Sequence, residues 1–424
     1  MKTFGQSSFK QGQGPTNKLN RREMMSAGLA LGLTGVVLPG QTLSPVLGEV
    51  HAGESGKEPT TDVRNNGLAS IKGPSALLNK KLEETSISGP TRACGKAYGS
   101  IFADLMHGYM TRETKPSHSR LGFAKACLPF IEKYTPFSFD FLRGAAEGSG
   151  FTLEQLTLLS LYEEIWKGSG LAAEQHTYEG HCTAFISSRT RSKDERTIVG
   201  QSWDFWPHDF PWVGLLRLQC DGHPATLTFN FPGMWSGCGI NSDGLAQMWT
   251  SAGFLPVLAN APGVPTYILI SELLNRKSVP ESVDFLQKTP NAGAYIFLLA
   301  DAKGRTAVVE ALPGGKLAVD YSPVNCRTNQ YDIPELIEAS YQDLSDPEAK
   351  STKIRNKEAH KILQSCNESL SLDVIKSALT TKPIFREELF YCITIASLIA
   401  CCEERALWHC RGGLKPDKWI KTVL

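Results

Sequence analysis

The hydrophobic pattern of this chain changes its period near residue 180, and this change constrains the fold more than any other feature. Between about residues 95 and 171 the apolar residues recur three or four positions apart, which is typical of amphipathic helices. Beyond residue 180 the apolar stretches become short, β-branched or aromatic, and turn residues bound them, which indicates strands. A helical part followed by a strand-rich part favours an α+β layered sandwich with antiparallel sheets.

The positions of single elements follow from the same pattern. Thr152 can cap a helix that has Glu154 in its first turn and that runs to about residue 166. A hairpin is predicted around Asn241-Ser242-Asp243-Gly244, because Asp-Gly tolerates the positive φ angles of a tight turn. A second hairpin turns at 301–304. Other strands are expected at 183–188, 197–202, 213–220, 225–231, 391–400 and 405–410, and other helices at 265–275, 280–287, 352–364 and 371–380.

The composition is that of a globular protein. The 424 residues are 41% hydrophobic and 21% charged, which excludes disorder as the dominant state. The net charge of +1 gives no basic surplus of the kind that nucleic-acid-binding proteins usually have. The eleven cysteines lack zinc-finger spacing, the nine histidines are scattered, and nucleotide-binding and zinc-protease motifs are absent from the sequence. We therefore expect no cofactor, no metal ion and no nucleic-acid partner.

Residues 1–52 have the layout of an export signal. They hold five basic and two acidic residues, and the pair Arg21-Arg22 precedes an apolar run over 24–38. That run is shorter than the ~20 residues that a membrane-spanning helix needs. A buried helix or a membrane anchor is the alternative, but the twin arginines favour a twin-arginine export signal. We expect a periplasmic or extracellular bacterial protein with no stable membrane span after signal removal, followed by a flexible linker over 53–90.

Cys182 is the strongest candidate for chemistry. It stands where the pattern changes period, directly before a predicted strand. A nucleophilic thiol needs a base. One candidate base is a histidine elsewhere in the fold. The other is the cysteine's own α-amine, with a pKa of about 7.7–8.0 once the preceding peptide bond is cut. Such a cut would separate the helical part from the strand-rich part.

Six segments, in the same order, resemble the fungal isopenicillin-N acyltransferase (acyl-coenzyme A:6-aminopenicillanate acyltransferase) family of N-terminal-nucleophile hydrolases. The first resemblance joins His181-Cys182-Thr183 to GQSWDF at 200–205. The chain departs from the family at His181, at Ser202 in place of Asn and at Gln330 in place of His. The other matching segments are LRGAAEG at 142–148, LYEE at 161–164, GINSDGL at 239–245, LLAD at 298–301 and TNQY at 328–331, and all of them together span about residues 95–411.

The resemblance implies a four-layer αββα sandwich and a precursor that cuts itself. Cys182 would attack the carbonyl of His181, giving a helical α chain over 91–181 and a β chain over 182–424, which together form one structural domain. By the same resemblance, Asp204 holds the new α-amine or its neighbours, and Asn329 donates into the oxyanion hole. Asn241 is a second polar residue of the site, or else only a hairpin residue.

Several functions share these features. The favoured one is a hydrolase of N-acyl amides, and the alternative is an acyltransferase that passes the acyl group to an amine. Export favours hydrolysis, because acyl-coenzyme A is absent outside the cytoplasm. A non-catalytic binding protein and a papain-like hydrolase that is not processed are further alternatives. An aromatic-rich region either lines an acyl pocket or packs between sheets; it contains Trp203, Phe205, Trp206, Phe210, Trp212 and Trp235.

Overall fold

The computed structural model describes residues 70–72, 82–166, 182–206, 209, 213–231, 233, 237–253, 259–340, 345–388, 392–413 and 415–424. The export signal predicted at 1–52 lies outside these residues. So do most of the predicted linker, His181, Phe210, Trp212 and Trp235.

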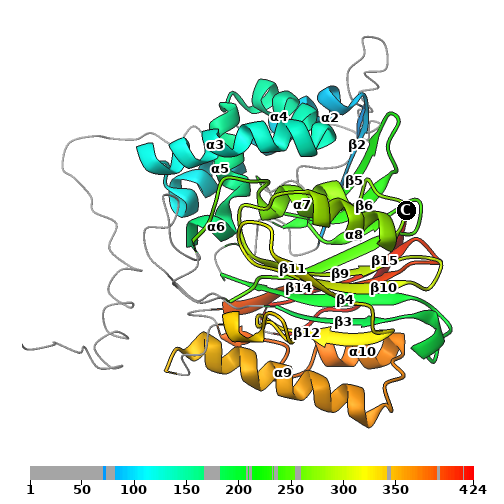
Figure 1. Ribbon diagram of the computed structural model, residues 1–424. Helices are drawn as coiled ribbons and strands as arrows, with labels where there is room; N and C mark the ends of the chain where they lie inside the picture. The colour runs from blue at the N-terminus through cyan, green and yellow to red at the C-terminus, as the bar shows by residue number, and fades with distance from the viewer. Residues whose placement is uncertain are drawn as a thin grey trace, which may run out of the picture. The chain divides into compact units, whose positions relative to one another are not determined.

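Two sheets lie face to face at the centre of this part of the chain (Figure 1). Among the described strands only β2 and β5 pair in parallel, and all other neighbours pair antiparallel. The nine-stranded sheet runs, in spatial order, through β1 (Ser70–Lys72), β2 (Glu84–Gly89), β5 (Gly214–Cys220), β6 (Thr226–Asn230), β7 (Gly239–Asn241), β8 (Ala246–Thr250), β9 (Tyr295–Ala300), β10 (Thr306–Ala311) and β11 (Leu317–Asp320). The seven-stranded sheet runs through β12 (Val324–Arg327), β3 (Thr183–Ser187), β4 (Ile198–Phe205), β14 (Cys392–Cys401), β15 (Ala406–Arg411) and β16 (Ile420–Val423), with β13 (Glu387–Glu388) paired to β14.

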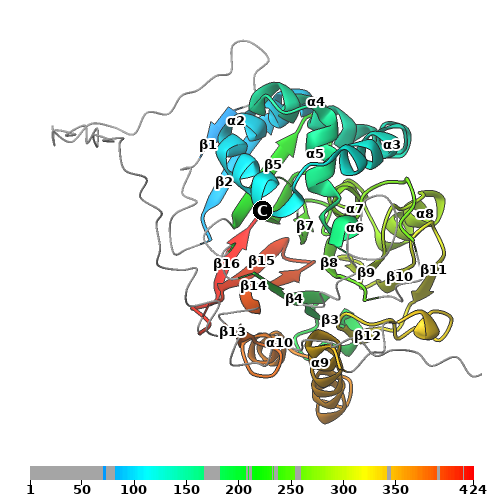
Figure 2. The same cartoon turned by 90° about the vertical axis from the view of Figure 1, so that its left-hand side faces the viewer.

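Helices cover the outer face of each sheet, as both views show (Figures 1 and 2). On the nine-stranded sheet, α7 and α8 pack against β8 to β10, α2 packs against β2 and β5, and α3 to α6 continue this helical layer. The helices of this layer are α2 (Thr91–Tyr109), α3 (His118–Tyr134), α4 (Pro136–Ser149), α5 (Leu153–Ser160), α6 (Tyr162–Trp166), α7 (Thr266–Leu273) and α8 (Val279–Lys288). The seven-stranded sheet carries α9 (Pro347–Ser365) and α10 (Leu372–Leu379). The α+β sandwich of four layers predicted from the sequence is therefore confirmed.

The burial of the inner strands explains why the sequence of the strand-rich half contains continuous apolar runs. In β3, Ala184 and Ile186 belong to the core between the sheets, whereas Phe185 packs into a second core beneath α9 and α10. Every residue of β3 and of β4 is buried. A strand with both faces covered has no solvent side, so a polar alternation is not needed.

The structure corrects the predicted elements at a few places. The segment 53–90 is not linker throughout, because β1 and β2 lie within it and β2 joins the large sheet. The helix expected from Thr152 has the predicted cap, but it is divided at Leu161 into α5 and α6. Helix α9 starts at Pro347, earlier than predicted, because Asp346 caps it. Strands β11, β12 and β16 were not predicted, since four residues give too short a period-2 pattern to recognise.

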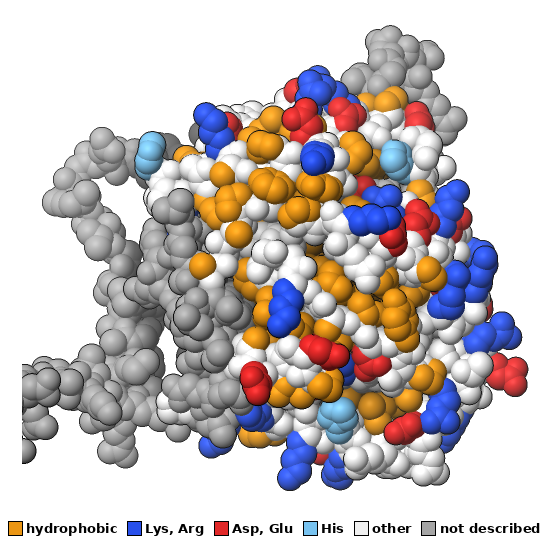
Figure 3. Space-filling view, in the orientation of Figure 1, with side chains coloured by type: hydrophobic (Ala, Val, Ile, Leu, Met, Phe, Trp, Pro, Cys, Tyr) orange, Lys and Arg blue, Asp and Glu red, His pale blue; other side chains and the backbone are white. Residues whose placement is uncertain are grey.

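Charges of both signs are interspersed over the face seen in Figure 3. Within the described residues, no helix combines the length and the apolar character that crossing a membrane requires.

Helices α2 and α4 pack with their backbones in contact. A Cβ atom added at Gly144 would lie 2.0 Å from the carbonyl oxygen of Arg92, and one at Gly148 would lie 2.0 Å from that of Lys96. Gly95, on the opposing helix, meets the carbonyl oxygen of Phe141 in the same way. The two glycines of the LRGAAEG segment are therefore required by helix packing, which needs no catalytic role for them.

Gly144→Ala should destabilise the protein, because its methyl group would collide with backbone that cannot rotate away. We expect the free energy of unfolding to fall by about 3 kcal/mol or more. Gly122→Ala is the matched control, since Gly122 lies in α3 with no atom within 4 Å of the added Cβ. That variant should be unchanged or more stable by up to about 1 kcal/mol. Urea unfolding of both variants measures the difference, and equal midpoints would contradict the packing argument.

Candidate active site

Strand pairing brings the predicted site residues together around Cys182. Arg327 of β12 lies opposite Ala184 of β3, so two further residues of the antiparallel register bring Asn329 opposite Cys182. On the other side of β3, Thr183 lies opposite Ser202 of β4, and Asp204 follows two residues later. Asn329 lies 147 residues after Cys182 and Asp204 lies 22 residues after it, and the two strand pairings of one sheet bring both residues close to Cys182.

Both ends of Cys182 are held by hydrogen bonds. Its backbone N–H donates to Oδ1 of Asn329 at 3.0 Å. Its carbonyl oxygen accepts from Nη1 of Arg355 at 2.6 Å. Cys182 is only 4% exposed. The preceding residue, His181, which carries the carbonyl of the predicted cleavage site, lies outside the described residues.

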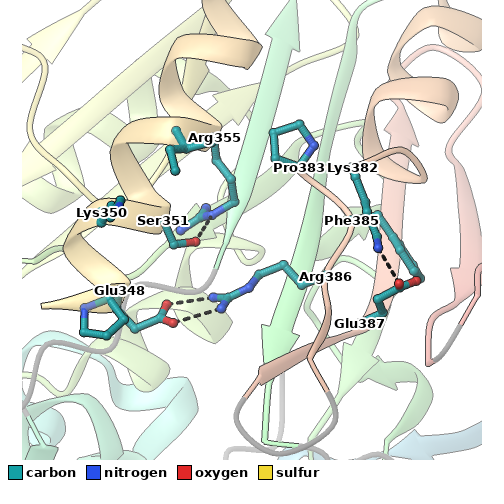
Figure 4. Close-up of a pocket in the computed structure, with 11 residues that line it drawn as sticks. Glu348, Lys350, Ser351, Arg355, Lys382, Pro383, Phe385, Arg386 and Glu387 are labelled. Atoms are coloured by element: carbon teal, nitrogen blue, oxygen red, sulfur yellow. Dashed lines mark hydrogen bonds and ion pairs between the residues drawn. The ribbon is translucent and has the colours of Figure 1, made fainter. Parts of the chain in front are cut away.

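Arg355, in the middle of α9, completes the cluster from the other side of the sheet. Its Nη1 donates to the carbonyl oxygen of Cys182 at 2.6 Å, and its Nη2 donates to Oδ1 of Asn329 at 3.0 Å. Figure 4 shows its side chain beside Ser351, whose Oγ accepts from Nε at 3.3 Å. Arg355 has no recognisable signal in the sequence, because a buried arginine in a predicted amphipathic helix cannot be told from one on its solvent face.

The surroundings of Asn329 fix the orientation of its side-chain amide. Two N–H donors, from Cys182 and Arg355, meet its oxygen, so this oxygen cannot be the nitrogen. Its Nδ2 faces Ser251 and lies 2.8 Å from the carbonyl oxygen and 3.1 Å from Oγ of that residue. The resemblance assigned this nitrogen to an oxyanion hole. In the arrangement seen here, it has to leave Ser251 before it can donate to a substrate oxygen.

Asp204 lies at the end of a chain of buried polar groups. Its Oδ1 accepts from Oγ1 of Thr394 at 2.6 Å, and this hydroxyl accepts in turn from the backbone N–H of Arg386 at 2.8 Å. Arg386 forms a two-point ion pair with Glu348, at 2.7 and 2.9 Å (Figure 4). Burial raises the pKa of Asp204 to about 6, and the positive charges of Arg355 and Arg386 oppose that rise.

A very small cavity of about 10 Å³, about the space of one water molecule, lies beside Cys182. Its aromatic wall contains Trp249, whose ring lies edge-on to Trp203 with centroids 5.6 Å apart and edge-on to Tyr267 with centroids 5.3 Å apart. Burial, followed by the charge of Asp204, raises the pKa of the Cys182 thiol to about 12. The thiol is therefore protonated at neutral pH and needs a base to become a nucleophile. The remaining residues of the wall are Glu163, Asp204, Phe205 and Ser251.

Two of these wall residues come from helices that precede and follow Cys182 in the chain. Glu163 lies on α6, and the hydroxyl of Tyr267 on α7 donates to its Oε1 at 3.3 Å. Glu163 belongs to the LYEE segment, so its location was signalled by the sequence although no role was assigned to it. Ser251 and Tyr267 had no recognisable signal. Within the described ranges, no group of three or more His, Cys, Asp or Glu side chains is placed to hold a metal ion.

Asn241 is not among the residues that line this cavity. Its Nδ2 donates to the carbonyl oxygens of Leu274 and Arg276, and its Oδ1 accepts from the backbone N–H groups of Asp243 and Leu245. All four hydrogen-bonding positions of the amide are thereby used. The interpretation of Asn241 as a hairpin residue accounts for them, whereas Ser251 is among the polar residues that line the cavity.

Asp204→Asn should remove a pH dependence of stability. The carboxyl pKa is 3.8 in its ordinary state and about 6 in the folded protein, so the folded state binds the proton more tightly. The contribution of Asp204 to the free energy of unfolding therefore falls as pH rises from about 4 to about 6 and is constant above that window. The shift corresponds to about 3 kcal/mol.

Asparagine can still accept from Thr394 but does not ionise, so the variant should be more stable than the wild type above pH 6 by up to this amount. Urea unfolding between about pH 4 and pH 8 checks the difference. Parallel pH profiles for the two proteins would show that Asp204 is not responsible.

Comparisons with known proteins agree with the motifs. Residues 190–413 match the family model described as acyl-coenzyme A:6-aminopenicillanic acid acyl-transferase. No curated protein sequence matches the chain. Among solved structures, a mutant of conjugated bile acid hydrolase from Clostridium perfringens is similar at 12% identity, over 57% of this chain and 97% of that one, with a TM-score of 0.40. Penicillin V acylase from Agrobacterium tumefaciens is similar at 16% identity, over 54% and 83%, with a TM-score of 0.31.

These TM-scores are too low for the assignment to depend on them, and it rests on the family match, which covers more than half of the chain. The chain belongs to the acyl-coenzyme A:6-aminopenicillanic acid acyl-transferase family.

Proposed function

We propose that this protein is an exported, self-processing hydrolase of N-acyl amides, in which Cys182 is the N-terminal nucleophile and carries the acyl group as a thioester. The observation that supports this most directly is the set of contacts around Cys182. Its N–H donates to Asn329, and its carbonyl oxygen accepts from Arg355. Any buried N–H and C=O need partners, but those of Cys182 are both met by polar side chains from other elements and not by the backbone of a neighbouring strand.

Processing is the first reaction of the proposed cycle. The sulfur of Cys182 adds to the carbonyl carbon of His181, and the bond from that carbon to the Cys182 nitrogen breaks, which leaves a thioester and a free α-amine. Water then hydrolyses the thioester, so that His181 gains a carboxylate and Cys182 regains its thiol. The products are the chains that end at His181 and begin at Cys182.

Turnover repeats the same chemistry on a substrate amide. The thiol has a pKa of about 12, so a base has to take its proton during attack. The new α-amine, with an ordinary pKa of about 7.7–8.0, belongs to the same residue as the sulfur and is that base. The oxygen of Asn329, which accepts from the Cys182 nitrogen, would keep the amine directed toward the sulfur. The substrate amine leaves, and water releases the acid.

N-terminal sequencing of the purified protein tests the processing step. The protein should consist of two chains, one of which begins at Cys182, and Cys182→Ala should remain one chain. Cys326→Ala is the matched control, because this buried thiol of the neighbouring strand β12 should have no part in the cut. A wild-type protein that is fully active while uncut would refute the α-amine mechanism. Slow cutting would not, since His181 is bulkier than the glycine of the fungal enzyme.

Two substitutions of Asn329 separate its proposed roles. Asn329→Ala should lower kcat by about 10²–10³ with little change in KM, because an oxyanion donor acts mainly on the tetrahedral state. Asn329→Asp keeps an oxygen toward Cys182 and Arg355 but loses the donor. Cutting that persists in Asn329→Asp while kcat falls would assign Nδ2 to the oxyanion. Normal turnover of Asn329→Ala would show that the role belongs to another residue.

Acyl transfer is the alternative reaction, and the description of the matched family favours it. The two reactions differ only in what attacks the thioester. With a thioester donor and an amine both present, a transferase forms the amide and a hydrolase forms the free acid, so product analysis decides between them. Export favours the acid, because acyl-coenzyme A is absent outside the cytoplasm.

Export itself is proposed from the sequence of residues 1–52. A reporter fused to these residues should leave the cytoplasm, and replacement of Arg21 and Arg22 by lysine should prevent it. Unchanged export of the double variant would remove the twin-arginine interpretation.

A further inference from the structure

Two buried cysteines both neighbour Gly89, at the corner where β2 leads into α2. The thiol of Cys94, in the first turn of α2, donates to the carbonyl oxygen of Gly89 at 3.3 Å. Gly89 is the register partner of Cys220 at the end of β5, and its oxygen also accepts from the N–H of Asp221 at 3.0 Å. The Cys94 thiol therefore lies against the carbonyl group of the residue that is paired with Cys220. Cys94 is fully buried and Cys220 is 3% exposed.

Backbone contacts hold this corner in place. The parallel pairing of β2 with β5 fixes Gly89 beside Cys220, and the N–H of Cys94 donates to the carbonyl oxygen of Pro90 at 2.9 Å. Both cysteines are therefore attached to backbone whose separation is set by hydrogen bonds. A disulfide forms without movement of the backbone only where the two Cα atoms are about 4.4–6.8 Å apart, so a fixed corner of this kind favours or forbids the bond by its geometry alone.

The proposed cleavage would place the two cysteines of this pair in different chains. Cys94 lies in the part of the chain that ends at His181, and Cys220 lies in the part that begins at Cys182. We propose that Cys94 and Cys220 form a disulfide in an oxidising compartment and that this bond links the two chains of the processed enzyme. Formation of the bond depends only on the geometry of the pair, whereas its role as a link between chains rests on the proposed function.

The chemistry is an exchange with a disulfide oxidant such as oxidised glutathione. Each thiol loses a proton, the two sulfurs of the protein lose two electrons in forming the S–S bond, and the oxidant is reduced to two thiols. The attacking species is a thiolate. Contact with Cys94, together with burial, raises the pKa of Cys220, so the exchange is slow in the closed fold and proceeds while the corner is open.

The experiment measures the bond directly. Purified full-length wild-type protein and Cys182→Ala are equilibrated in glutathione redox buffers with a sub-denaturing concentration of urea, and their free thiols are then blocked with N-ethylmaleimide. Mass spectrometry of unreduced digests should find the Cys94–Cys220 peptide pair in both proteins. The pair should be absent from Cys94→Ala and from Cys220→Ala. It should persist in Cys127→Ala, a buried thiol of α3 in the same part of the chain.

Denaturing gels of the wild type, run with and without reductant, test whether the disulfide links the two chains. Processed protein should run as one band without reductant and as two bands with it. Cys366, which is partly exposed, reports whether the oxidant was active, because it should carry glutathione. If Cys366 is modified while Cys94 and Cys220 are both recovered blocked by N-ethylmaleimide, the disulfide proposal is wrong. An uncut wild type that still contains the linked peptides would overturn the proposed cleavage and leave the disulfide standing.

Discussion

The hydrogen bonds from Arg355 join three parts of the chain that are distant in sequence: helix α9, the start of β3 and the loop after β12. A guanidinium in the protein interior is costly unless its donors are satisfied. The N–H groups of Arg355 face five acceptors, and these are the carbonyl oxygen of Cys182, Oγ1 of Thr183 and Thr352, Oδ1 of Asn329 and Oγ of Ser351. The residue is 1% exposed, so any movement of α9 relative to β3 would leave buried donors unpaired. The geometry of Cys182 therefore depends on the packing of a helix on the far side of its own sheet.

The layering of the fold could be predicted because it depends on short-range pattern. The change of period near residue 180 marks the passage from the helical layer into the sheets, and the runs of buried residues in β3 and β4 follow from the helices on one side and the second sheet on the other. Strand β2 could not be predicted in the same way. Its six residues, ETSISG, have little apolar character, and the strand is stabilised by its pairing with β5, which lies far along the chain.

The residues of the candidate site also fall into two groups, those that lie in recognisable sequence segments and those that only tertiary contacts bring to the site. Cys182, Asp204 and Asn329 lie in recognisable segments, and the register of β3 with its two neighbours brings them together. Arg355, Ser251 and Tyr267 contribute through tertiary contacts that leave no local pattern. Asn241 illustrates the opposite error. Its segment matched the family well, but the reason for an asparagine there is a turn in which four backbone groups meet its amide.

The place of β3 within its sheet has a consequence for the end that processing would create. Chain termini usually fray, because they have neighbours on one side only. Strand β3 is an interior strand, with β12 along one edge and β4 along the other. A terminus at Cys182 would thus begin inside a ladder, with Thr183 already paired to Ser202. An amine at that point has few accessible orientations. The conformational entropy of ordering it is therefore lost once, when the protein folds, and not again each time a substrate binds.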